Sequence, residues 1–355
     1  MPAQKDVTKP DGIEAQLDKE RRKVDVATLN FSVRELVRMM SDSELRVAPE
    51  YQRKFRWTEA GESSFIESVF LGLPIPPLFV ATNIGFQWEV VDGLQRLSTL
   101  MHFLASNPEE LAIINRNASL RLKGLEKLSA LNGIAYGELP KAVQVYFGRQ
   151  PLQVVSLTDK SDLQVRFDVF ERLNKGAVAL TAQEVRACVF RGEFNQFLEH
   201  LAEDENFLRL LKLQEARQYD GTKAEQVLKF FAYKDGRAKF DGRVEHFLNS
   251  YMEEAASRFN YQANESLFHR ATAKLYQICG GPFVRSDYNV TPLVQFEACL
   301  VAIAELIESN EQIIYPSENW QDDPELKRSS MGGTNNRTAL RRRIERAKVL
   351  FSGAT

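Results

Sequence analysis

The segment VVDGLQRLSTL, residues 90–100, places an acid, a glycine and an arginine where a predicted strand turns into a predicted helix. Backbone N–H groups point out of the first turn of such a helix, and partial positive charge gathers there. Gly93 permits a positive φ and a close approach of a ligand to the backbone, and the Arg96 guanidinium suits a phosphate group. Asp92 offers a carboxylate to Mg²⁺. The spacing therefore predicts an anion site at this turn.

A purely structural interpretation of the same residues stays open. In it, Asp92 only caps the helix and Arg96 pairs with a surface carboxylate. The DGxxR spacing alone does not decide between the two interpretations. The sequence contains no GxxxxGK[ST] motif, and this excludes a P-loop nucleotide site.

Two other segments are rich in side chains that suit ligand contact. PEYQRKFRW, residues 49–57, combines arginine, glutamine and aromatic side chains at a density unusual for a simple loop. VFERLNKGAVALTAQEVRACVF, residues 169–190, contains a polar Asn-Lys-Gly turn at 174–176. The glycine of that turn also has an ordinary interpretation as a helix stop, and a capping box from Thr181 to Glu184 gives Glu184 a structural explanation.

The spacing of apolar residues predicts an α+β fold. We expect amphipathic helices at 32–44, 58–71 and 94–104, a hairpin at 74–93, and strands at 120–122 and 152–158. From residue 162 onward the period is helical, with segments at 162–173, 181–202, 222–235, 241–256, 264–279 and 292–309. An α/β half should therefore position the turn, and an all-helical half should follow it.

These elements divide the chain into four expected parts. They are a mobile lead-in at 1–26 with some helix near residues 14–22, an α/β domain at 27–175 that contains the predicted anion site, a helical domain at 176–325 and a basic C-terminal helix at 326–355. The seam between the two halves falls at the 174–176 turn, which we expect to act as a hinge.

Composition excludes several other classes of protein. The formal net charge of the 355 residues is -2, so any surface for nucleic acid must be local. The three cysteines lack CxxC spacing, which argues against a disulfide framework or a zinc knuckle. No apolar run of about 18 residues occurs. We therefore expect a soluble, cytoplasmic protein with reduced thiols and no membrane contact.

The three polar segments, taken in order, resemble the N-terminal domain of the GmrSD-type, modification-dependent restriction family. That family carries a [VP]PxxQRxYxW segment, a DGQQR motif in a strand-loop-helix, and an FxxLNxxGxxLxxxE segment. Here the corresponding stretches are YQRKFRW at 51–57, DGLQR at 92–96 and residues 170–184. Leu94 departs from the family, which usually has glutamine there. The resemblance covers roughly residues 30–260 and implies a fold similar to ParB and sulfiredoxin.

The resemblance also implies a function and its residues. The family's DGQQR loop binds nucleotide phosphates and members hydrolyse a nucleoside triphosphate, often in defence against phage through modified DNA. Carried over, this makes Arg96 a phosphate ligand, Asp92 a group that holds Mg²⁺ or positions water, and the nucleotide GTP or ATP. The remaining pocket residues that it implies are Gly93, Gln95, Gln52, Asn174 and Arg53, the last as a catalytic arginine.

The sequence does not show the HNH nuclease motif that full-length members commonly add. Its four histidines sit in helical patterns without metal-ligand spacing, and we expect them to be packed or solvated helix residues. We therefore do not expect the chain to cut DNA by itself, and a nuclease or other defence protein acting in trans would supply cleavage. Two alternatives to a triphosphatase stay open. One is a non-hydrolytic ParB-like module that binds DNA or nucleotide, and the other is a DNA nuclease acting through the same domain.

One strongly basic stretch occurs, at residues 327–348, with eight Lys or Arg against one Glu. Leu340, Ile344 and Ala347 form a narrow apolar stripe on a predicted helix there, which we expect to dock on the helical domain. The arginines should then face outward and contact the phosphates of duplex DNA. They are Arg337, Arg341, Arg342, Arg343 and Arg346. A solvated final helix with no ligand is the alternative interpretation.

Overall fold

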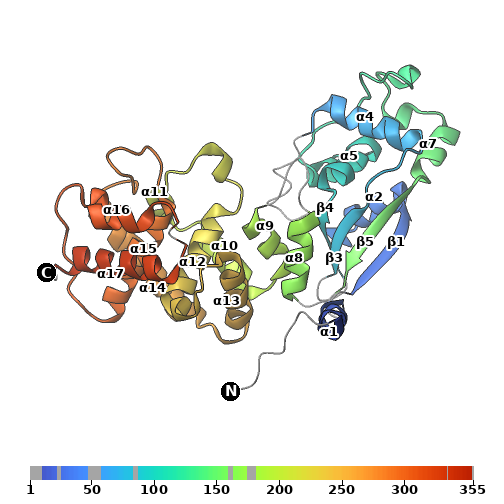
Figure 1. Ribbon diagram of the computed structural model, residues 1–355. Coiled ribbons are helices and arrows are strands. Elements are labelled where there is room, and N and C mark those ends of the chain that lie inside the picture. The colour runs from blue at the N-terminus through green and yellow to red at the C-terminus, as the bar shows by residue number, and fades with distance from the viewer. Residues whose placement is uncertain are drawn as a thin grey trace. The chain divides into compact units, whose positions relative to one another are not determined.

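The computed structural model describes residues 10–21, 25–46, 57–82, 87–158, 163–173, 181–333 and 335–353 (Figure 1). The chain divides into two compact units, Met1–Ala179 and Leu180–Thr355. The first combines a sheet with helices and the second is helical within its described residues, so the predicted α+β fold is confirmed. None of the described helices has the length and apolar content needed to cross a membrane.

A mixed sheet of five strands forms the centre of the first unit. The order across it is β1-β5-β3-β4-β2. β1 runs antiparallel to β5, β5 parallel to β3, β3 antiparallel to β4, and β4 parallel to β2. The strands are β1 (Val26–Ser32), β2 (Leu45–Arg46), β3 (Leu78–Thr82), β4 (Trp88–Asp92) and β5 (Pro151–Leu157).

The helices of this unit begin where the sequence supplies caps. The Ser32 side chain accepts a hydrogen bond from Glu35 N at the start of α2, and Thr58 accepts one from Gly61 N at the start of α4. Gly72, at φ +65°, follows the C-cap residue of α4 and ends the helix close to the predicted residue 71. The helices are α1 (Pro10–Arg21), α2 (Val33–Ser41), α4 (Glu59–Phe70), α5 (Leu94–Leu104), α6 (Pro108–Ile113), α7 (Lys141–Gly148) and α8 (Leu163–Leu173), with short 3₁₀ turns at Ser129–Leu131 and Tyr136–Glu138.

One apolar core lies between α2, α4, α5 and α7 and one face of the sheet. Leu36, Ile66, Leu97, Phe103 and Phe147 have no measurable exposure and belong to this core. Each comes from the buried stripe of its helix, so the 3.6-residue period of the sequence fixes which face packs. Because α5 is anchored along its length, the turn that precedes it is held on a rigid support.

The predicted hairpin is confirmed, since β3 and β4 pair antiparallel. The strand expected at 120–122 is wrong, because the structure has only an isolated bridge between Arg121 and Ala135 there. The sequence analysis did not predict β1 as a strand, although β1 pairs with β5 along its whole length. The helix expected near residues 14–22 is α1.

The second unit is built around α15 (Leu293–Glu308), whose residues 295–304 are all buried. The single helix expected at 181–202 is two helices in the structure. Gly192, which adopts φ +147°, is the N-cap residue of the second one. The other helices are α9 (Ala182–Val189), α10 (Glu193–Leu201), α11 (Glu205–Leu210), α12 (Thr222–Gly236), α13 (Val244–Arg258), α14 (Tyr261–Cys279), α16 (Pro324–Ser330) and α17 (Arg337–Ser352), with 3₁₀ turns at Glu215–Arg217, Arg237–Lys239 and Trp320–Asp322. Cys188 and Cys299 are buried and all three cysteines are free thiols.

Candidate functional site

The turn between β4 and α5 has the backbone that the sequence predicted. Gly93 adopts φ +100°, in the left-handed region, and stands at the N-cap position of α5. Within the described residues no side chain caps this helix, so Asp92 does not act as its cap. Gly93 has no side chain that could accept a hydrogen bond from the first turn of α5.

Gly93 is also needed for packing. A Cβ added at this position would overlap the Leu78 Cδ2 atom and would lie 3.2 Å from Arg96 Nη2. The space beside the glycine is therefore occupied by protein side chains. Leu78 and Arg96 approach the backbone of Gly93 closely, and a ligand at the turn would share this space with them.

Arg96 is held over the turn by three acceptors. Its Nη2 donates to Asp92 Oδ2 at 2.8 Å, and its Nη1 donates to the carbonyl oxygens of Pro77, at 3.1 Å, and Pro76. The Arg96 side chain is 12% exposed and that of Asp92 is 38% exposed. Burial lowers the pKa of the Arg96 guanidinium from its usual value, and the Asp92 carboxylate opposes that shift. The arginine is thus a cation with a fixed position at the start of α5.

The Pro76 and Pro77 carbonyl groups were not identified by the sequence analysis. Both precede β3, some 20 residues before Arg96 in the chain, and proline supplies only an acceptor from its backbone. The PIPPL segment before a predicted strand was the available signal. It indicated an extended backbone whose carbonyl oxygens need donors.

The first polar segment reaches the turn through its last residue. Trp57 N donates to the Gln95 side-chain oxygen at 3.2 Å. Gln95 therefore joins the end of the 51–57 segment to the start of α5, and two of the three polar segments meet here. Arg53 and Gln52 lie outside the described residues.

The third polar segment is described only at its two ends. Phe170 of α8 is fully buried in the first unit. At the other end, Thr181 N donates to Glu184 Oε2 at 2.7 Å and Glu184 N donates to Thr181 Oγ1 at 3.3 Å, so the predicted capping box is confirmed. Asn174 and the whole predicted hinge at 174–176 lie outside the described residues.

Leu94, where the family pattern has glutamine, is partly buried and packs against the core of the first unit. An apolar side chain there adds to the anchoring of α5. The departure therefore has a packing role, and the backbone of the turn keeps the conformation that Gly93 allows.

The donor set at the turn suits Mg²⁺ only together with a ligand. Among the described residues, no group of three or more His, Cys, Asp or Glu side chains lies close enough to hold a metal ion. Asp92 has one carboxylate oxygen beside Arg96. Mg²⁺ is commonly held by one or two carboxylates plus substrate phosphates, so Asp92 fits that arrangement and does not fit an all-protein metal cage.

A second basic surface lies on α17. Arg337, Arg341 and Arg342 are exposed, and they line a groove of about 500 Å³. The groove is completed by Thr338, Glu325, Glu345, Arg346 and Val349. Arg337 Nε donates to the Phe240 carbonyl oxygen at 3.0 Å, and this bond uses one of the five guanidinium N–H donors. We call these residues the α17 groove.

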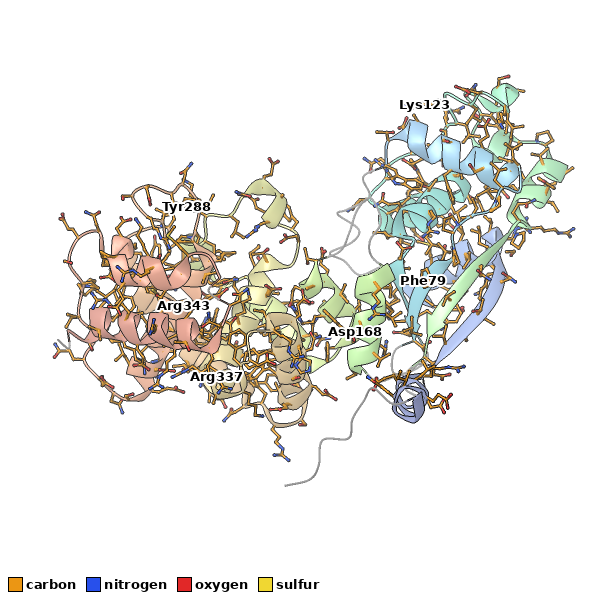
Figure 2. The ribbon with its side chains drawn as sticks, viewed as in Figure 1. Phe79, Lys123, Asp168, Tyr288, Arg337 and Arg343 are labelled. Atoms are coloured by element: carbon orange, nitrogen blue, oxygen red, sulfur yellow. The ribbon has the colours of Figure 1, made fainter. Side chains whose placement is uncertain are left out.

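Arg343 corrects the prediction that the arginines of this helix all face outward (Figure 2). Its exposed fraction is 1%, and it lies on the buried face with Leu340, Ile344 and Ala347. The helical period explains this, because positions 340, 343, 344 and 347 share one side of a helix. Burial lowers the Arg343 pKa, and Glu297 on α15 opposes the shift.

Arg346 also differs from an unpaired surface cation. Its Nη2 donates to Asp323 Oδ2 at 2.7 Å and its Nε to Asp323 Oδ1 at 3.1 Å. This two-pronged hydrogen bond raises the pKa of Arg346. Since Asp323 neutralises Arg346, that arginine has less charge to offer a ligand than Arg341 or Arg342.

The expectation that the histidines are packed or solvated is met by His102 of α5, which is buried. Its Nδ1 lies 2.6 Å from Glu62 Oε2 and its Nε2 lies 2.9 Å from the Ala118 carbonyl oxygen. Arg116 also reaches Glu62, at 3.4 Å. This buried pair ties α5 to α4, so it supports the turn from the opposite end of the helix.

Comparison with protein families gave a match to part of the chain that includes the turn. Residues 33–191 match the family model described as "GmrSD restriction endonuclease, N-terminal domain". The matched range runs from the first residue of α2 to just past α9, so it includes the turn and excludes α17. Comparison with curated proteins and comparison with solved structures gave no significant match.

Proposed function

Residues 33–191 form a GmrSD-type N-terminal domain, which indicates a component of a restriction or antiphage defence system, and on this basis we propose that the chain binds and hydrolyses a nucleoside triphosphate. The observation that carries the proposal is the fixed position of Arg96 at the start of α5, where no side chain among the described residues caps the helix. GTP and ATP both present the phosphate chemistry that such a site takes.

In the proposed complex, phosphate oxygens accept hydrogen bonds from the first-turn N–H groups of α5 and from Arg96. Phosphoryl transfer depends mainly on positioning and on positive charge around the transferred group, and a clamped arginine supplies both. Asp92 would hold Mg²⁺ together with the phosphate oxygens, and the ion would supply positive charge during transfer. The family resemblance, and not the described structure, assigns Gln52, Arg53 and Asn174 to the same pocket.

The attacking water needs a base, and the nearby acids differ in access. Glu89 on β4 is 1% exposed, so it is too deeply buried to face water at the turn. Asp92 is partly exposed and stands at the turn itself. Within the described residues we therefore assign the positioning of water to Asp92. A non-hydrolytic ParB-like module is the second candidate. Asp92 already binds Arg96, and this pairing competes with a role for Asp92 in positioning water.

We further propose that the α17 groove binds the phosphate backbone of duplex DNA. Arg337, Arg341 and Arg342 follow one another along about 8 Å of helix, at 1.5 Å of rise per residue. Phosphate contacts of this kind position a protein on DNA without reading sequence. The same proposal includes recognition of a DNA modification by this chain. It also includes a nuclease partner that cuts the DNA in trans.

The test is release of phosphate from GTP and from ATP with Mg²⁺, in the presence of plain duplex DNA, modified duplex DNA or no DNA. Arg96→Ala should lower kcat/KM by about 100-fold, as expected when one transition-state donor is removed. Arg96→Lys keeps the charge but loses the two-pronged geometry, so it should restore little. Arg121→Ala, which removes an exposed arginine paired with Glu138, is the matched control.

Three outcomes would count against this assignment. Unchanged turnover in folded Arg96→Ala removes the site from the turn. Tight nucleotide binding by the wild-type chain without phosphate release selects the non-hydrolytic module. Nicking of plasmid DNA with Mg²⁺ or Mn²⁺, lost in Asp92→Ala, would make the domain itself the nuclease.

A further inference from the structure

Among the described residues, the sheet of the first unit ends in a strand that lacks the usual protection of an edge. β1 is the outermost strand beside β5, and Figure 1 shows it along the outer side of the sheet. Its sequence, VATLNFS, contains neither a charged residue nor a proline. Natural edge strands usually carry charge, proline or a bulge that prevents pairing with another chain. The pairing of β1 with β5 is also regular from Val26 to Ser32.

The hydrogen bonds of β1 show which of its backbone groups face outward. Thr158 N donates to the Asp25 carbonyl oxygen at 3.1 Å, and Val33 N donates to the Gln150 carbonyl oxygen at 2.9 Å. Bonded pairs alternate in an antiparallel ladder, so the odd-numbered residues from 25 to 33 bond to β5. The N–H and C=O groups of Val26, Thr28 and Asn30 therefore point away from the sheet.

Apolar side chains accompany these outward groups. Leu29, at the centre of the strand, is 41% exposed, and Val26 is 43% exposed. If a second β1 pairs antiparallel with Leu29 on the two-fold axis, Thr28 of one copy stands opposite Asn30 of the other, and their backbone groups bond. The two Leu29 residues then form a non-hydrogen-bonded pair, in which side chains approach most closely. That arrangement covers Leu29.

The charges at the ends of β1 favour the antiparallel direction. Asp25 precedes the strand and Arg34 follows it by two residues. Antiparallel pairing brings Asp25 of one copy toward Arg34 of the other, whereas parallel pairing would set like charges side by side. An interface of this kind uses the same surface on both copies, as two-fold dimers do.

We infer that two copies of this chain associate through β1, antiparallel, with Leu29 on the two-fold axis. The two sheets then form one continuous sheet across the dimer. This inference rests on the strand edge alone and is independent of nucleotide or DNA binding.

Sedimentation of the full chain at micromolar concentrations tests the association. The wild-type chain should sediment as a dimer. Leu29→Lys places two like charges on the axis, and Thr28→Pro removes an outward N–H without breaking a bond to β5, so each should weaken the dimer at least tenfold. Leu73→Lys is the control, because Leu73 is 48% exposed and lies in the segment before β3. Thermal unfolding checks that each variant is folded.

A disulfide test fixes the register. Cysteines at position 29 should be close enough in the dimer to join, so Leu29→Cys with oxidised glutathione should give a covalent dimer that dithiothreitol separates. Thr28→Cys, whose residue faces Asn30, should give far less. The wild-type chain under the same conditions reports any contribution of Cys188, Cys279 and Cys299.

The inference is overturned by a wild-type chain that sediments as a monomer, or by a dimer that persists unchanged in both Leu29→Lys and Thr28→Pro. A covalent dimer from Thr28→Cys but not from Leu29→Cys would also overturn it, because the two-fold axis would then lie elsewhere.

Discussion

The salt dependence of DNA binding should reveal how many arginines of α17 contact phosphate. Log affinity falls against log salt concentration with a slope of about 0.9 for each phosphate neutralised. The eight basic residues of the 327–348 segment would give a slope of about 7 if all of them took part. Arg343 is buried and Arg346 is paired with Asp323, so the structure predicts a smaller contribution.

The variant to test replaces Arg337, Arg341 and Arg342 together by glutamine. If each contacts one phosphate, the slope should fall by about 2.7. Over a change from about 50 to 200 mM salt, this difference corresponds to about 40-fold in affinity. Fluorescence anisotropy of a labelled duplex, measured at several salt concentrations, gives both slopes. Substitution is preferable to truncation, because α17 buries Leu340 and Ile344 in the second unit.

The refuting results are specific. A triple variant with the wild-type slope would show that the α17 groove does not contact DNA. Arg346→Gln should change the slope by much less than Arg341→Gln, and an equal change would show that Asp323 does not withdraw Arg346. Arg258→Gln, at the C-terminal end of α13, is the control with an exposed arginine outside the groove.

The other predictions concern stability. Gly93→Val should lower the Tm more than Gly124→Val. Both glycines have a positive φ, but of the two only at Gly93 would the new Cβ overlap a side chain, that of Leu78. Equal losses of Tm would contradict the packing role of Gly93. Glu297→Gln should lower the Tm by several degrees, because buried Glu297 binds the partly buried Lys229 at 3.1 Å and its loss leaves that ammonium less compensated. A Glu297→Gln variant as stable as an exposed-pair control such as Glu308→Gln would refute this.

Features that depend on neighbours in the chain were predictable. The caps at Ser32 and Thr58 and the capping box at Thr181 each need only a side chain and a backbone N–H three residues away. The hairpin formed by β3 and β4 also follows from local composition. In each case the deciding interaction joins residues that are close in the sequence, so a sequence pattern can identify it.

Features that depend on distant partners were not predictable in the same way. β1 was missed because VATLNFS becomes a strand only through β5, more than 100 residues later. The orientation of Arg343 is a different kind of miss. The period of α17 placed it beside Leu340 and Ile344, but its charge argued for exposure. Glu297 on α15, which favours the charged form of the buried guanidinium, is distant in the sequence and could not be foreseen.

Gly93 shows how the two kinds of information combine at the candidate site. The Asp-Gly sequence predicted its positive φ, while the crowding by Leu78 could come only from the structure. Because the glycine is required for both reasons, loss of activity in a Gly93 variant would not distinguish a broken turn from a lost ligand contact. Arg96 does not share this ambiguity to the same degree. Its substitution takes a donor from Asp92 and from two proline carbonyl groups, but it leaves in place the glycine that adopts the positive φ. The function of the turn should therefore be decided by Arg96 variants, with folding measured alongside turnover.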